Sequence, residues 1–127
     1  MSGGRPTKYK PEYCQKIIDY FNVPLTERVG AKKEASELPM LIGFAMEIGV
    51  SYETILEWTK VHEEFSHAYK SAKRLQEKLI AANAMNNRYN AYFAQFMLKN
   101  NHGWKDKQEV EQTQSIKIEI DADDEAV

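Results

Sequence analysis

The most informative segment of the chain is Leu38 to Lys60, LPMLIGFAMEIGVSYETILEWTK, whose pattern predicts two short helices on either side of a tight turn. Gly49 can take the left-handed backbone conformation that ends a helix, and Ser51 is a typical residue to cap the next one. The pattern predicts one helix from near Pro39 to Gly49 and another over residues 52–61. This order is typical of a helix-turn-helix unit.

Small and apolar residues at fixed distances from the turn support this interpretation. Ala45 precedes Gly49 by four residues and is small enough for two helices to cross closely, while Ile55 and Trp58 share one face of the second helix. In DNA-binding proteins, the N-terminal part of the second helix enters the major groove. The candidate DNA contacts of this unit are Ser51, Tyr52, Thr54 and Lys60.

Two carboxylates count against groove reading. Glu53 and Glu57 fall on the exposed face of the second helix, where they repel phosphates. A three-helix core unit that never touches DNA therefore remains an equal alternative at this point.

The rest of the chain supplies further helices and an N-terminal arm. Residues 1–11 are rich in glycine, proline and cations and predict an arm rather than a packed element. Apolar residues at spacings of three and four predict three more helices, and the polar residues 22–37 predict a long connection. The helices are expected over residues 12–22, 63–86 and 91–101, the last with Gly103 as its C-terminal cap.

Only one segment alternates as a half-buried strand does. Ser115–Ile120, SIKIEI, places isoleucines on one face and charges on the other. A lone strand has no partner for its backbone, so it must pair with another chain or stay disordered. We expect a mainly α fold in four parts: a basic arm (1–11), a helix-turn-helix region (12–62), a helical hairpin for oligomerisation (63–105), and a polar linker, strand and acidic tail (106–127).

The charge of the chain is divided unevenly. The 127 residues carry 17 Lys and Arg against 19 Asp and Glu, a formal net charge of −2. Residues 1–105 are net +4 and residues 106–127 are net −6. Such asymmetry is typical of an interaction protein. Two further sets of candidate DNA contacts follow, the arm with Arg5, Lys8 and Lys10 and the longest helix with Lys70, Lys73 and Arg74; a solvated tail and a solvated helix face are the alternatives.

Several classes of protein are disfavoured. The spacing of the three histidines and the single Cys14 closes no metal site, and there is no phosphate-binding glycine loop or nucleophile elbow. We therefore expect no enzyme activity, no metal and no cofactor. A lone cysteine fits a reducing cytoplasm, and no apolar run approaches a membrane span or a signal peptide.

Three runs together resemble a known family: FAMEIGVSYETILEW (44–58), HEEFSHAYKSAKRLQEKLI (62–80) and YNAYFAQFMLKNNHGWKDK (89–107). With the basic arm and the tyrosine-rich first helix, they resemble the small terminase subunit of tailed bacteriophages over about residues 7–110. The acidic end DADDEAV departs from relatives that end in a basic tail, so we expect this tail not to bind DNA.

The resemblance implies a function that the residues alone do not. Small terminases form rings of about eight to eleven subunits, bind viral double-stranded DNA, recruit the large terminase that holds the ATPase and nuclease, and have no activity of their own. It also implies a location in the host cytoplasm and a barrel of C-terminal strands. The oligomer interface is then expected to involve Phe65, Leu75, Phe96, Ile116, Ile118 and Ile120.

Two other readings compete with a packaging ring. A helix-turn-helix transcription regulator would bind a palindrome as a twofold dimer and leave two half-sites in a footprint. A structural adaptor would assemble without binding DNA. The strand and the acidic tail have no evident role in such a transcription regulator.

Overall fold

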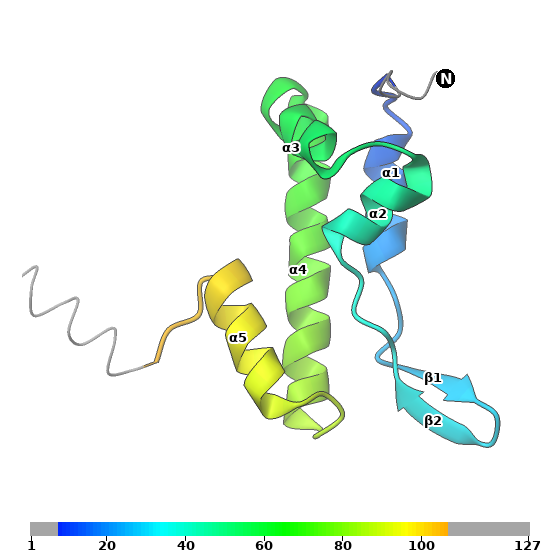
Figure 1. Ribbon diagram of the computed structural model, residues 1–127, viewed down its shortest axis with the longest axis vertical. Helices are drawn as coiled ribbons and strands as arrows, with labels where there is room; N and C mark the ends of the chain where they lie inside the picture. Colours follow the sequence, from blue (N-terminus) through cyan, green and yellow to red (C-terminus); the bar gives the residue numbers. More distant parts are fainter. Residues whose placement is uncertain (1–7, 107–127) are drawn as a thin grey trace, which may run out of the picture.

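The computed structural model describes residues 8–106, which form five helices and one two-stranded sheet (Figure 1). The elements are helix α1 (Tyr13–Phe21), strands β1 (Thr26–Val29) and β2 (Lys32–Ala35), and helices α2 (Leu41–Ile48), α3 (Tyr52–Val61), α4 (Glu63–Met85) and α5 (Ala91–Asn101). The expected mainly α fold is confirmed. The strand predicted at residues 115–120 lies outside the described residues.

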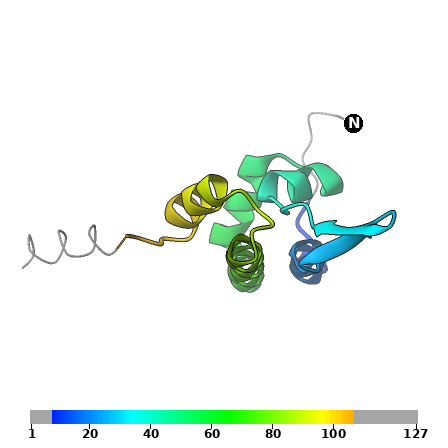
Figure 2. The ribbon, with the colours of Figure 1, turned by 90° about the horizontal axis from the view of Figure 1, so that it is seen from below.

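Helix α4 is the axis of the molecule. Its 23 residues span about 35 Å, and α1, α3 and α5 all pack against it. Helices α1 and α3 lie at its N-terminal half and α5 at its C-terminal half (Figure 1). Viewed from below, α5 and the β-hairpin lie on opposite sides of α4 (Figure 2). No helix among residues 8–106 is both long and apolar enough to cross a membrane.

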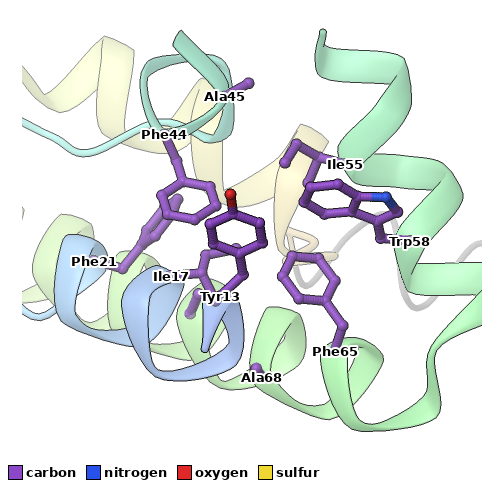
Figure 3. Close-up of a cluster of buried hydrophobic side chains, with 10 residues drawn as sticks. Tyr13, Ile17, Phe21, Phe44, Ala45, Ile55, Trp58, Phe65 and Ala68 are labelled. Atoms are coloured by element: carbon purple, nitrogen blue, oxygen red, sulfur yellow. The ribbon is translucent and has the colours of Figure 1, made fainter. Parts of the chain in front are cut away.

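The main core lies where α1, α2, α3 and α4 meet. Side chains from all four helices converge there (Figure 3). Trp58 stacks on Tyr13 with ring centroids 5.4 Å apart and meets the edge of Phe65 at 5.7 Å. The buried residues of this cluster are Tyr13, Ile17, Phe21, Phe44, Ala45, Ile55, Trp58, Phe65, Ala68 and Ala72. Most of them are the residues that helical spacing predicts to face inward.

A smaller cluster joins the second half of α4 to α5. It contains Ile80, Ala94, Met97 and Leu98. Two other apolar residues on the apolar sides of these helices point outward, since Met85 is 78% exposed and Phe96 is 61% exposed. Periodicity identifies these helices correctly, but it overestimates how much of their apolar surface one chain covers.

The structure of residues 22–37 differs from the prediction. Their polar composition predicts a long connection, but they contain the antiparallel hairpin of β1 and β2. Gly30 and Ala31 form its two-residue turn, and Gly30 has a φ of +65°, which favours glycine. Both faces of this hairpin are largely exposed, so no alternation of apolar and polar residues marks its strands.

Polar side chains of α4 and of the segment that follows it hold the connections in place. Asn83 is fully buried and donates from Nδ2 to the Leu25 carbonyl at 3.1 Å. Tyr89 donates from its hydroxyl to the Ser36 carbonyl at 2.6 Å. Leu25 and Ser36 flank the two strands, so the base of the hairpin is attached to the end of α4.

The expected boundaries need two further corrections. Helix α2 begins at Leu41 rather than near Pro39, because Met40 is still extended. The predicted arm over residues 1–11 is packed at Tyr9, which joins the main core as a partly buried residue. A single aromatic side chain in a polar segment gives no periodic signal.

Replacing Trp58 by Ala should destabilise the fold by about 3–5 kcal/mol, because a large buried side chain is removed from a small core. The free energy of unfolding in urea, followed by circular dichroism, measures this loss. Trp104→Ala is the matched control, since that tryptophan is 47% exposed. Equal losses in the two variants would contradict the central position of Trp58.

Candidate nucleic-acid interface

A tight turn sets the angle between α2 and α3. Gly49 has a φ of +80°, and the Val50 amide donates to the Ala45 carbonyl at 3.0 Å, which closes the end of α2. Ala45 is buried at this crossing, as the spacing predicted. On the α3 side, Ile55 and Trp58 fix the helix to the core, so the opposite face of α3 is turned to solvent.

Two of the predicted DNA contacts at the start of α3 take part in capping this helix. The Ser51 hydroxyl accepts from the Thr54 amide at 3.1 Å and lies 2.8 Å from the Thr54 hydroxyl. These two side chains therefore stabilise the first turn of α3. Tyr52, which is exposed, is the predicted contact of this turn with no such capping role, and Glu53 is exposed beside it.

The N-terminal arm is attached at the junction of α3 and α4. Tyr9 stacks on His62 with ring centroids 3.7 Å apart, and its hydroxyl donates to Glu64 Oε2 at 2.8 Å. Burial raises the pKa of Tyr9, so its hydroxyl stays a donor, and this hydrogen bond lowers the pKa of Glu64. Lys8 and Lys10 are exposed on either side of Tyr9, while Arg5 lies outside the described residues.

The cationic row of α4 faces a hollow beside the end of α5. Lys70, Lys73 and Arg74 line this hollow of about 440 Å³, together with residues 101–103. Arg74 also pairs with Glu77 at 3.3 Å, and Trp104 donates to the same carboxylate at 2.6 Å. These contacts lower the pKa of Glu77, the Trp104 hydrogen bond most of all. One acidic group thus offsets part of the positive charge.

The structure brings some predicted contacts together across helices. Tyr52 and Lys73 line a second hollow, of about 330 Å³, bounded by α2, α3, α4 and the end of α5. The Lys73 ammonium also lies 5.9 Å from the centre of the Tyr69 ring. Tyr52, Lys70, Lys73 and Arg74 therefore border two hollows that share Lys73. Lys60, in the last turn of α3, is exposed two residues before His62, on which Tyr9 stacks.

A chain of hydrogen bonds links the end of α5 to α4. His102 Nε2 lies 2.8 Å from Gln76 Oε1, and Gln76 Nε2 donates to the Pro39 carbonyl at 2.8 Å. Burial lowers the pKa of His102, and the nearby Lys73 and Arg74 add to this effect while Glu77 opposes it. The lowered pKa favours the neutral imidazole at this junction. Sequence reasoning missed this link, because only a three-dimensional contact relates residues 76 and 102.

The predicted interface residues differ in their exposure. Phe65 is fully buried in the core of its own chain, and Leu75 is half-buried against the same core. Phe65 thus has no surface to offer to another subunit in this conformation. Phe96 is exposed on α5, beside Tyr92 and Phe93. The predicted residues Ile116, Ile118 and Ile120 lie outside the described residues.

Comparison with protein families identifies the class to which this helical chain belongs. A family model of DNA-packaging proteins matches residues 4–110, which include every described residue. The chain belongs to the DNA-packaging protein gp3 family. This membership agrees with the resemblance to small terminase subunits and supports a role in phage DNA packaging. Neither the search of curated proteins nor that of solved structures finds a match.

His102 should make the stability of the fold sensitive to mild acid. Because its pKa is lowered from 6.5 in the folded state, the unfolded chain binds the proton more tightly, and the stabilisation falls as pH drops through 6.5. His102→Gln should flatten the decline of the unfolding free energy between about pH 7.5 and about pH 5.5. His67→Gln, a change at an exposed residue on α4, is the control. A wild-type pH dependence in His102→Gln would contradict this assignment.

Proposed function

We propose that the chain is a ring-forming, non-catalytic terminase subunit that recognises viral DNA and recruits the large terminase. The observation that carries this proposal is its membership of the DNA-packaging protein gp3 family over residues 4–110.

The DNA contact is proposed to combine the α2–α3 unit with the arm and α4. The turn at Gly49 and the capped start of α3 support a helix-turn-helix role, with Tyr52 as the first groove contact. The cations Lys70, Lys73 and Arg74 supply sequence-independent attraction to phosphates. Arm residues Arg5, Lys8 and Lys10 extend this attraction, and Lys60 adds to it at the end of α3.

The ring is proposed to use exposed apolar surfaces at two places. A closed ring needs two different surfaces on each subunit, because neighbours meet head to tail. Helix α5 offers Tyr92, Phe93 and Phe96, and α2 offers Ile42 and Met46, which are 55% and 76% exposed. Leu75, half-buried on α4, is a secondary candidate.

The C-terminal segment is proposed to act beyond the helical body. In a ring, the isoleucines at 116, 118 and 120 could pair between subunits as strands. Residues 106–127 are net −6, and this acidic tail is then proposed to meet the large terminase. Its charge gives it no attraction to DNA.

Replacing Arg5, Lys8 and Lys10 by Ala should weaken binding to duplex DNA of any sequence. The slope of log affinity against log salt should become shallower by about 1 for each phosphate that the arm no longer neutralises. Fluorescence anisotropy over a range of salt concentrations measures both effects. Lys16→Ala, on the exposed side of α1, is the control that measures how much affinity is lost when one cation outside the arm is removed. An unchanged affinity would remove the arm from the interface, and a wild-type chain that binds no DNA would refute the proposed recognition.

Phe96→Glu should reduce the mass of the assembly, because it places a carboxylate in the proposed apolar contact. Native mass spectrometry at micromolar concentration measures the subunit number. Gln95→Glu is the matched control, since it adds the same charge at the neighbouring exposed residue of α5. A monomeric or dimeric wild type would refute the ring, and a footprint of two half-sites would then favour the dimeric regulator.

A further inference from the structure

The β-hairpin separates its charges by face. The register pairs Arg28 with Lys33 and Glu27 with Glu34. Because successive side chains of a strand point to opposite faces, the two cations lie on one face and the two carboxylates on the other. Lys32, the remaining cation of the strands, shares the face of the carboxylates.

The paired charges are close and of like sign. The Ser36 amide donates to the Leu25 carbonyl at 3.0 Å, which makes that pair a hydrogen-bonded one. Because hydrogen-bonded and non-hydrogen-bonded pairs alternate along antiparallel strands, Arg28 and Lys33, three pairs further on, form a non-hydrogen-bonded pair. Facing side chains approach most closely in such pairs. Like charges at such positions destabilise a hairpin. The stability of the hairpin therefore does not explain why like charges face each other across its strands.

Nothing in the described chain neutralises the cationic face. Both cations are exposed, and neither side chain makes a hydrogen bond or an ion pair within residues 8–106. The hairpin projects from the helical body (Figures 1 and 2). The cationic pair is therefore accessible to a large partner.

The hairpin is nevertheless held in a defined direction. A two-stranded hairpin is marginally stable alone, yet this one is attached at its base by Asn83 and Tyr89. Asn83 is fully buried, and its Oδ1 also accepts from Arg88 at 3.3 Å, so both ends of its amide are satisfied. Such an attachment orients the cationic face relative to α4.

We propose that the Arg28–Lys33 face is a further contact for the phosphate backbone of duplex DNA. This inference rests on the DNA-binding role proposed above and adds an element to it. Phosphates supply the negative charge that the pair lacks, and the contact positions the protein without reading sequence. The carboxylates at 27 and 34 repel DNA from the opposite face, so the contact is one-sided.

Three single charge reversals in the full chain test the proposal. Arg28→Glu and Lys33→Glu each create an opposite-charge pair across the strands, so they should not destabilise the hairpin. Each should nevertheless weaken duplex binding several-fold and make the salt slope shallower by about 1. Lys32→Glu is the matched control, because it makes the same charge change on the opposite face. Fluorescence anisotropy gives affinity, thermal unfolding gives stability, and native mass spectrometry gives the subunit number.

The outcomes separate this inference from the function on which it rests. Loss of affinity in the first two variants, with Lys32→Glu near wild type, supports the contact. Equal losses of affinity in all three variants would overturn the proposed contact in favour of diffuse electrostatic attraction. Wild-type affinity in all three would exclude the hairpin from the DNA interface without contradicting DNA recognition by the rest of the chain. A changed subunit number with unchanged affinity would overturn it in favour of a contact between copies of the chain. A wild-type chain that binds no duplex would overturn both proposals.

Discussion

The packing of aromatic rings around Trp58 holds α1, α3 and the N-terminal half of α4 together. Tyr13 of α1 stacks on one side of the indole, and Phe65 of α4 meets it edge-on. Tyr9 joins the same group from the arm, at 5.4 Å from Trp58. Because α1, α3, α4 and the base of the arm share these contacts, the direction of α3 and the exit of the arm are set together. Any surface that α3 offers to DNA depends on this cluster.

Polar side chains of α4 fix the positions of two connecting segments by hydrogen bonds. Gln76 and Asn83 are buried and donate to backbone carbonyls of Pro39 and Leu25. Since a buried amide is costly unless it is hydrogen-bonded, these contacts favour one position for each segment. The same helix therefore orients the entry to α2 and the base of the hairpin, although neither lies near it in sequence.

The exposed surface of the chain combines features that suit a component of an assembly. Aromatic residues Tyr92 and Phe96 are exposed on α5, whereas cations gather along α4 and on one face of the hairpin. The formal net charge of −2 hides these separate regions, because residues 1–105 are net +4 whereas residues 106–127 are net −6. The chain belongs to a DNA-packaging family, and the proposed function assigns the cationic regions to nucleic acid and the apolar ones to neighbouring subunits.

Helical periodicity and capping are local properties of the chain, so the helices, the turn at Gly49 and the Ser51 cap could be predicted from the sequence. It also identified most of the core residues. It did not determine the β-hairpin, whose strands are exposed on both faces and carry no alternating pattern. The three-dimensional contacts were needed to show that Tyr9 packs on the core, that Phe65 is enclosed while Phe96 is exposed, and that Arg28 faces Lys33. Each of these depends on contacts or register between segments, which spacing along one chain does not encode.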